Sequence, residues 1–277
     1  MRDFGEILSE VRSRIERACA KARRDISEVE IVAVTKTHGD EVVREAFNAG
    51  LVMAGENKVQ EAMWKKSAAP SGVEWHLIGH LQTNKVRHAL TTFDVIHSVD
   101  SIRLADKIEA VAAELGRRPR ILLEVNVAGE KSKSGLKPQE VEETLRHIVE
   151  ESNRITVEGF MTMAPFTMEP EGSRVYFRTL RELRDRMQDR FGFALPRLSM
   201  GMSGDFEVAV EEGATWLRLG TVLFGERPKL GKPGAGSRES GTENWEPDDR
   251  EKVPRRMKRE RTLDSYCGEG PTVKILD

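Results

Sequence analysis

Apolar and polar positions alternate along the chain with two different periods. Residues 3 to 24 place apolar side chains three or four positions apart, which predicts one amphipathic helix. From Glu30 onward, short apolar runs of strand length alternate with helical patterns. The predicted strands lie within 30–36, 51–57, 74–79, 93–100, 120–128, 155–164, 196–202 and 215–225. The predicted helices between them cover 40–50, 59–68, 83–90, 101–116, 137–152, 173–191 and 205–214.

This alternation of about eight strands with helices predicts an α/β fold, a single closed parallel (β/α)8 TIM barrel with an extra N-terminal helix. A doubly wound open sheet is the alternative. We favour the barrel because polar residues gather at the C-terminal ends of many strands. An open sheet would concentrate them at one switch point.

The pattern changes after Pro228, where Gly, Pro, Ser and charges of both signs replace the apolar positions. We expect a barrel domain over residues 1–228 and a disordered polar and charged tail over 229–277. The tail segment KVPRRMKRER could contact an acidic surface or nucleic acid, but its acidic neighbours favour a solvated mixture of charges. The terminal PTVKILD is a weak candidate for a docking motif.

Charge and composition narrow the function classes. A formal net charge of −2 over 277 residues lacks the basic excess that nucleic-acid binding requires. The 2 cysteines, Cys19 and Cys267, show neither a disulfide pattern nor a metal-ligand spacing. No apolar run is long enough for a signal peptide or a bilayer span. We therefore expect a cytoplasmic protein with no nucleic-acid or membrane partner.

Lys36 closes the first predicted strand, IVAVTK. A lysine there either extends its ammonium group into solvent or is held in a pocket for use. In a barrel the second alternative gains weight, because the C-terminal ends of the strands surround the site. A desolvated lysine can lose its proton and attack an aldehyde to form a Schiff base.

The segment from strand seven to strand eight, LSMGMSGDFEVAVEEGATWLRLGTVLFG, contains a candidate phosphate site. Ser203 stands before a predicted helix, and Gly220 and Thr221 end the last strand. Loops after strands seven and eight commonly bind phosphate in such barrels through backbone N–H groups and hydroxyls. The alternative is that these residues only make tight turns.

A lysine that can form a Schiff base and a phosphate site together suit the aldehyde and the phosphate of pyridoxal 5′-phosphate, abbreviated PLP. A sugar-phosphate aldolase would use the same pair of features. Arg218 favours PLP, since on strand eight it could face the pyridine nitrogen, although it could equally pair with a structural carboxylate.

Several segments carry a resemblance to a known family: AVTK, GENKVQE, WHLIGHLQTNK, IHSVDS, EKSKSGL, GFMTMAPF and the segment from strand seven onward. In order and spacing they resemble the YggS/PROSC family of pyridoxal phosphate homeostasis proteins, also called PLPBP. The resemblance runs from about residue 4 to residue 227 and implies the fold of the N-terminal barrel of alanine racemase without that enzyme's second domain. It covers nothing after Pro228.

The resemblance also implies roles for individual residues. Lys36 would form the Schiff base, and Arg218 would lie beside the ring nitrogen. The remaining implied residues are the phosphate contacts Ser203, Gly220 and Thr221 and the lining residues Asn57 and His76.

Considered without the resemblance, four polar residues have interpretations of their own: Asn57, His76, His80 and Lys133. Asn57 could cap the helix that begins with KVQE, an interpretation we favour slightly over contact with a cofactor. His76 and His80 predict no metal site, because no carboxylate or cysteine joins them. Lys133 could take an aldehyde from Lys36, although loop lysines are usually solvated.

The sequence favours a PLP carrier over an enzyme. Racemisation on PLP needs a base on each face of the adduct, and the barrel racemases take the second one, a tyrosine, from another domain. This chain has 2 tyrosines, Tyr176 on the long helix before strand seven and Tyr266 in the tail. We therefore expect a monomer that holds and releases PLP without substantial catalysis, with apo-enzymes that need PLP as candidate recipients. The alternative is a PLP-dependent amino-acid racemase or another Schiff-base enzyme.

Overall fold

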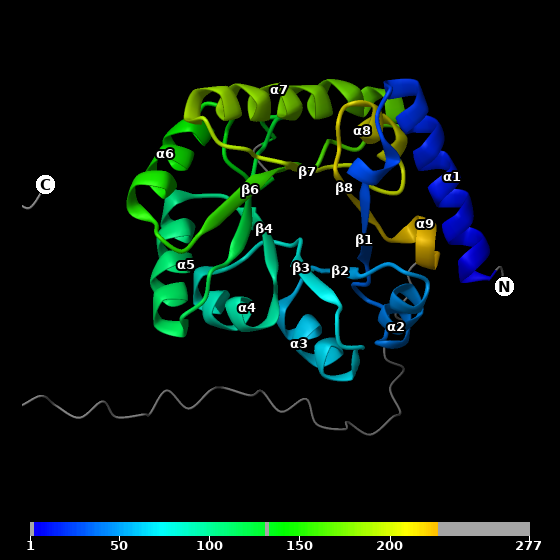
Figure 1. Cartoon of the computed structure of the whole chain (residues 1–277), viewed down its shortest axis with the longest axis horizontal. Coiled ribbons are helices and arrows are strands. Elements are labelled where there is room, and N and C mark those ends of the chain that lie inside the picture. The colour runs from blue at the N-terminus through cyan, green and yellow to red at the C-terminus, as the bar shows by residue number, and fades with distance from the viewer. Residues whose placement is uncertain (1–2, 131–132, 227–277) are drawn as a thin grey trace, which may run out of the picture. The chain divides into compact units, whose positions relative to one another are not determined.

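The computed structural model describes residues 3–130 and 133–226. They form a closed barrel of parallel strands in the order β1 to β8, which confirms the predicted barrel and excludes the open sheet (Figure 1). The strands are β1 (Glu30–Val34), β2 (Met53–Glu56), β3 (Glu74–Leu77), β4 (Val95–Val99), β5 (Arg120–Glu124), β6 (Thr156–Met161), β7 (Arg197–Ser199) and β8 (Trp216–Leu219). Because β8 pairs with β1, the sheet has no open edge.

Helices surround the strands on the outside of the barrel (Figure 1). They are α1 (Phe4–Ala22), α2 (Glu41–Asn48), α3 (Val59–Ala68), α4 (Val86–Thr92), α5 (Ile102–Leu115), α6 (Val141–Glu151), α7 (Arg174–Phe191), α8 (Phe206–Glu211) and α9 (Thr221–Phe224). Short 3-10 helices are η1 (Ile26–Glu28), η2 (Thr83–Lys85) and η3 (Pro170–Ser173). The predicted tail and its boundary at residue 228 lie outside the described residues.

The strands bury apolar side chains on both faces, because successive residues of a strand point to opposite sides. Along β1, Ile31 and Ala33 belong to the large core beneath the helices. Val32 instead joins a smaller cluster with Met53, Val95, Leu122, Met161 and Trp216. This second cluster fills the inside of the barrel, so the barrel is packed and has no pore.

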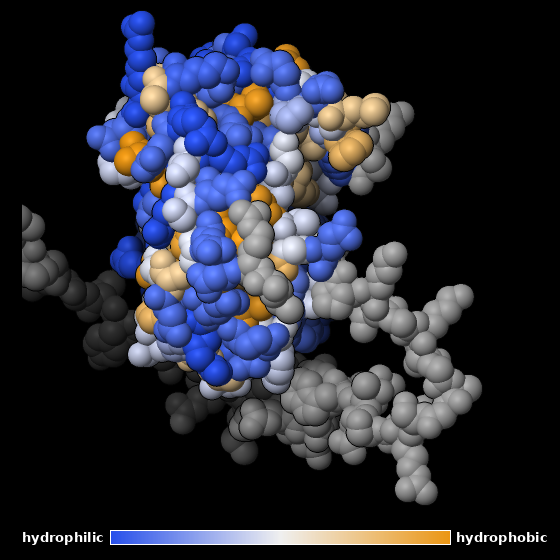
Figure 2. Space-filling model, turned by 90° about the vertical axis from the view of Figure 1, so that its right-hand side faces the viewer, coloured by the Kyte–Doolittle hydropathy of each residue, from blue (hydrophilic) through white to orange (hydrophobic). Residues whose placement is uncertain are grey.

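The N-terminal helix α1 covers the part of the barrel that the last helix leaves open. Helix α9 has only 4 residues, and α1 contacts both α8 and α9. Asp3 begins α1 by accepting a hydrogen bond from the Gly5 N–H. The helix buries Phe4, Leu8, Val11 and Ile15. Figure 2 shows the side of the barrel on which α1 lies, and its surface is mostly hydrophilic.

The sequence pattern missed α9. It placed the last strand within 215–225 with its end at Gly220 and Thr221, whereas β8 ends at Leu219 and α9 begins at Thr221. This break places Gly220 and Thr221 at the C-terminal end of the barrel. None of the described helices is long and apolar enough to span a membrane.

Candidate cofactor-binding site

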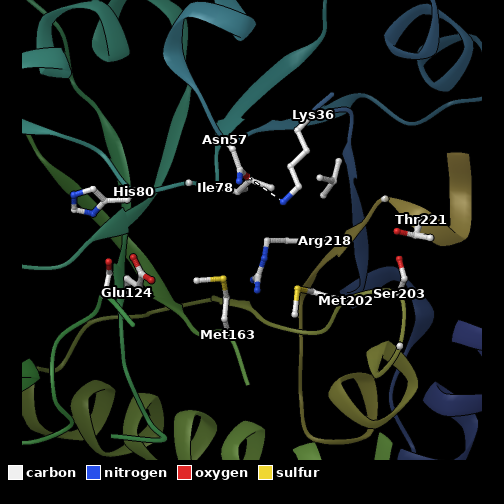
Figure 3. Close-up of a pocket in the computed structure, with 15 residues that line it drawn as sticks. Lys36, Asn57, Ile78, His80, Glu124, Met163, Met202, Ser203, Arg218 and Thr221 are labelled. Carbon is white, nitrogen blue, oxygen red and sulfur yellow. Dashed lines mark hydrogen bonds between the residues drawn. The ribbon is translucent and has the colours of Figure 1, made fainter. Parts of the chain in front are cut away.

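A cavity opens at the C-terminal ends of the strands, the end at which barrels of this kind have their sites. All of the site residues predicted from the sequence line it, except His76: Lys36, Asn57, Ser203, Arg218, Gly220 and Thr221. Figure 3 shows Arg218 at the centre of this cavity, with Lys36 on one side of it and Met163 on the other.

The pairing of β1 with β2 places Lys36 at the cavity. The register sets Val34 beside Gly55, and the same offset of 21 residues continues to the pairs Thr35–Glu56 and Lys36–Asn57. Lys36 Nζ donates to Asn57 Oδ1 over 3.4 Å. Since side chains alternate along an extended chain, Lys36 and Asn57 face the cavity while Thr35 and Glu56 face the helices.

A network of charged groups lies directly behind Lys36. Lys65 is fully buried, and its Nζ donates to the Thr35 carbonyl at 2.8 Å, to Glu56 Oε1 at 2.7 Å and to Glu61 Oε1 at 2.8 Å. Three acceptors use all three hydrogens of an ammonium group. We call Glu56, Glu61 and Lys65 the Lys65 network.

The Lys65 network holds the backbone on both sides of Lys36. Glu56 accepts from the Thr35 hydroxyl at 2.6 Å, and Glu61 accepts from the Thr37 N–H at 2.6 Å. Thr37 has φ +69°, which is costly for a β-branched residue and persists only where neighbours enforce it. The network therefore determines how Lys36 enters the cavity.

The pKa values of the two carboxyl groups of the network, Glu56 and Glu61, shift in opposite directions. Burial raises the pKa of Glu56, although the hydrogen bonds from Lys65 and Thr35 oppose the shift. It acts in the same direction on Glu61, but the hydrogen bonds from Lys65 and Thr37 prevail and lower the pKa of that group.

Ser203 and Thr221 lie at one end of the cavity (Figure 3), and Gly220, which precedes Thr221, also lines the cavity. Ser203 Oγ accepts from the Val222 N–H at 3.1 Å, so the loop after β7 is bonded to the first turn of α9. A Cβ atom at Gly220 would lie 3.3 Å from the Val34 carbonyl oxygen, so glycine allows β8 to end close to β1. Two hydroxyl groups beside a helix start suit a phosphate group.

Arg218 is buried within the barrel mouth, at 5% exposure. It donates to Ser199 Oγ at 2.8 Å and to the Thr162 carbonyl at 2.9 Å. Burial lowers the pKa of Arg218 to about 10, while Asp205 and Glu124 act in the opposite direction. Both of these oxygens are neutral, and within residues 3–130 and 133–226 no carboxylate forms a hydrogen bond with this guanidinium.

His76 lies inside the barrel and does not line the cavity. It is fully buried and its Nδ1 lies 2.8 Å from His97 Nε2. His97 Nδ1 in turn lies 3.0 Å from Ser199 Oγ. His76 is therefore linked to Arg218 through two intermediate side chains.

The hydrogen positions along this series of hydrogen-bonded side chains follow from Arg218, which can only donate. We assign Ser199 as the donor to His97 Nδ1 and His97 Nε2–H as the donor to His76 Nδ1. Burial lowers the pKa of His97, which agrees with a neutral ring.

The favoured interpretation of Asn57 as a helix cap is wrong. Lys58 precedes the first residue of α3, and its side chain makes no capping hydrogen bond.

A Cβ at Gly79 would lie 2.4 Å from the Asn57 carbonyl oxygen, so glycine lets the loop after β3 pass close to Asn57.

His80 and Lys133 lie near the cavity but have partners of their own. β3 ends at Leu77, so His80 belongs to the following loop and lines the cavity. Its Nδ1 lies 3.4 Å from Asp100 Oδ2. Lys133 pairs with Glu130 at 3.2 Å and donates to the Ala164 carbonyl at 3.3 Å.

The sequence analysis missed Glu124, Met163 and Met202 as lining residues. Glu124 is the last residue of β5 and lies at the same end of the barrel as Lys36, which follows β1. Its position near the end of a predicted strand was therefore an available signal. The sequence alone does not single out Glu124, however, because RILLE has the composition of an ordinary buried strand with a solvated end.

These residues fit the chemical groups of PLP. Lys36 supplies an amine for the aldehyde, and Ser203 and Thr221 supply hydroxyls at the far end of the same cavity. Arg218 offers only N–H donors, which suits an unprotonated pyridine nitrogen. PLP would supply the reactive aldehyde, and the chain would supply its binding and orientation.

The sequence matches the alanine racemase N-terminal domain family over residues 8–228. A pyridoxal phosphate homeostasis protein of Aquifex aeolicus is 47% identical over 223 residues, which cover 80% of this chain and 97% of that protein. The chain belongs to the family of pyridoxal phosphate homeostasis proteins.

Solved structures agree with this membership. PipY of Synechococcus elongatus with PLP bound has a TM-score of 0.70 and 36% identity, and the match covers 80% of this chain and 100% of PipY. An alanine racemase of Clostridium difficile has a TM-score of 0.65 and 16% identity, over 82% of this chain and 58% of that enzyme. At this low identity the second likeness shows the fold alone.

Proposed function

We propose that this family member binds PLP, holds it through a Schiff base on Lys36 and releases it to apo-enzymes that need it. Membership in the homeostasis family supports this role, as does the structure of PipY with PLP bound. The same proposal assigns phosphate contacts to Ser203, Gly220 and Thr221 and the ring nitrogen to Arg218.

The observation that carries the proposal is the shared cavity. Lys36 comes from the end of β1, Arg218 from β8, and Ser203 from the loop after β7, yet all three line one space. A sugar phosphate would use the lysine and the phosphate site, but it has no ring nitrogen for Arg218. The buried guanidinium therefore favours PLP over an aldolase substrate.

The site favours a carrier because it offers no tyrosine as a second base. Tyr176, the one tyrosine among residues 3–130 and 133–226, lies on α7 and packs against the outer core. Tyr266 lies outside the described residues. We propose that the carrier is a monomer.

Borohydride reduction tests the Schiff base. The protein loaded with PLP should absorb like a protonated imine, and reduction followed by peptide mapping should find the adduct on Lys36. Lys36→Ala should remove both signals and keep the fold, whereas the matched control Lys133→Ala should keep both. An adduct found chiefly on Lys133 would overturn the assignment.

Proton exchange in D₂O separates a carrier from a racemase. A racemase would exchange and invert the α-centre of its amino acid at ordinary turnover, on the order of 10 s⁻¹. We expect alanine incubated with the loaded protein to exchange only a few times faster than with free PLP. Enzyme-like inversion that disappears in Lys36→Ala would establish the racemase alternative instead.

A further inference from the structure

The cavity has a second polar end, on the side of Arg218 away from Ser203 and Thr221. Glu124 and His80 lie there in Figure 3, and Ser134 lines the same cavity. Neither the aldehyde, the ring nitrogen nor the phosphate of the proposed cofactor accounts for these groups.

Glu124 is the side chain that sets this end apart. It is 3% exposed, and its carboxylate makes no hydrogen bond to residues 3–130 or 133–226, although its backbone carbonyl accepts from the Leu136 N–H. The other two buried glutamates of the described chain are paired: Glu56 with Lys65, and Glu212 with three arginines. A buried carboxylate that faces a cavity without a partner is a site for a cation or a proton.

The charged groups around Glu124 come from three sides. Arg218 approaches from β8, Asp100 follows β4, and His80, which pairs with Asp100, follows β3. Burial raises the pKa of Glu124 to about 7, repulsion by Asp100 adds to the rise, and Arg218 opposes it. Near neutral pH this carboxylate can therefore accept a proton or release one.

We propose that the Glu124 end of the cavity binds the primary amine that takes PLP from Lys36. This inference rests on the proposed Schiff base. The ammonium group of the ligand pairs with the Glu124 carboxylate and transfers one proton to it, which frees the nitrogen lone pair. The C=N bond to Lys36 Nζ is then exchanged for one to the ligand nitrogen, and Lys36 leaves as a neutral amine.

The chemistry of the site selects this ligand class. An anionic ligand would be repelled by Glu124 and Asp100, and a quaternary ammonium ion has no proton to transfer. The described residues contain no group of three His, Cys, Asp or Glu that could hold a metal ion. A primary amine satisfies the carboxylate and also completes the exchange without an oxidant or reductant.

The first test measures release with ethylamine as the probe. Stopped-flow absorbance would follow PLP leaving the loaded protein as a function of ethylamine concentration. General base catalysis typically contributes about 10²- to 10⁴-fold, so Glu124→Gln should slow the exchange at least tenfold at pH 7. The wild-type rate should level off above pH 7, once Glu124 is ionised, whereas the rate of the variant should keep rising with the fraction of neutral ethylamine. The control Glu130→Gln, a rim acid paired with Lys133, should leave the rate unchanged. Equal rates in wild type and Glu124→Gln would overturn the proposal.

The second test uses the protein without PLP. Carboxyl ¹³C NMR should show Glu124 titrating near pH 7, and ethylamine, which is an ammonium ion at this pH, should lower that midpoint more than sodium chloride of equal ionic strength. An unchanged midpoint would overturn the amine site. If the wild type forms no Schiff base at all, the proposed function fails, but this titration still decides the role of Glu124. Glu124→Asp, which keeps the carboxylate, provides a second variant should Glu124→Gln not fold.

Discussion

The two ends of the barrel use charged residues in different ways. At the bottom, the strands β1, β3, β5 and β7 begin with Glu30, Glu74, Arg120 and Arg197. These four first residues come from alternate strands, as one layer of a barrel interior does. At the mouth the charged residues are Lys36, Glu124 and Arg218.

The difference lies in their partners. Arg120 donates to Glu158 at 2.5 Å and 3.1 Å and to Glu74 at 2.6 Å, and Arg197 donates to Glu30 at 2.7 Å. At the mouth, the hydrogen bonds of Arg218 within the described part of the chain go to neutral oxygens, and the Glu124 side chain forms none there. A charge paired inside the protein cannot be left without its partner at low cost, whereas a charge without an oppositely charged partner is available to a ligand.

The largest effect is expected at the phosphate end of the mouth. Each charge-assisted hydrogen bond to a phosphate is worth about 1.5–3 kcal/mol. Changing Ser203 and Thr221 together to alanine should therefore weaken PLP binding far more than it weakens the binding of pyridoxal, which lacks the phosphate. Titration of both ligands by absorbance gives the two dissociation constants, and equal losses would show that these hydroxyls do not bind phosphate.

The next effect concerns the Lys65 network. Near the mouth, this network pairs opposite charges within the protein, as the ion pairs at the bottom do. Lys65→Met leaves Glu56 and Glu61 without their cation, and removing one partner of a buried pair costs about 3–5 kcal/mol. We expect this loss in the free energy of unfolding by urea, together with slower Schiff-base formation on Lys36.

Lys66→Met is the matched control for that variant. Lys66 is the next residue along α3, is exposed, and donates only to the Thr92 carbonyl. It should change stability by less than about 1 kcal/mol. Similar losses in both variants would show that the helix tolerates neither change and that the network has no special role.

The third effect is a pH dependence that comes from Glu124. Its pKa is raised from 4.5 to about 7 in the folded protein. Below pH 4.5 the group is protonated in both states, and as pH rises toward 7 the unfolded chain loses the proton first. The folded state binds more protons in this interval, so stability falls as pH rises.

Glu124→Gln removes the carboxyl group that causes this fall in stability with rising pH. Relative to the wild type, the variant should gain up to about 3 kcal/mol of unfolding free energy between pH 4.5 and pH 8. Urea unfolding of both proteins at the two pH values measures the difference. A constant difference would mean that Glu124 ionises normally in the folded protein.

The smallest effect is expected at the bottom. Arg120→Met leaves Glu74 and Glu158 without their shared partner, but all three side chains are partly exposed to water. We expect a loss of about 1–2 kcal/mol in unfolding free energy and no change in PLP affinity. A marked loss of PLP affinity would show that the two ends are coupled, through His76 and His97 or otherwise.

Much of this molecule could be predicted from short stretches of sequence. Helix α3 has the predicted bounds, α5 is shorter than predicted by one residue at each end, and α7 starts one residue later than predicted. Lys36, Ser203 and Thr221 could be placed at the mouth of the barrel because each follows a strand with a clear pattern. His76 was misplaced because a strand pattern does not say how deep in the barrel a residue lies.

By itself, the sequence determined the succession of strands and helices and the end of the barrel at which polar residues gather. These properties depend on the spacing of apolar residues within about ten positions, which is local information. Tertiary structure alone decided which charges find partners. Lys65 meets the Thr35 carbonyl 30 residues away, and His97 meets Ser199 across 102 residues. Glu56 and Glu124 both end buried strands, and only the packing of helices on the barrel shows that the first meets Lys65 while the second faces the cavity.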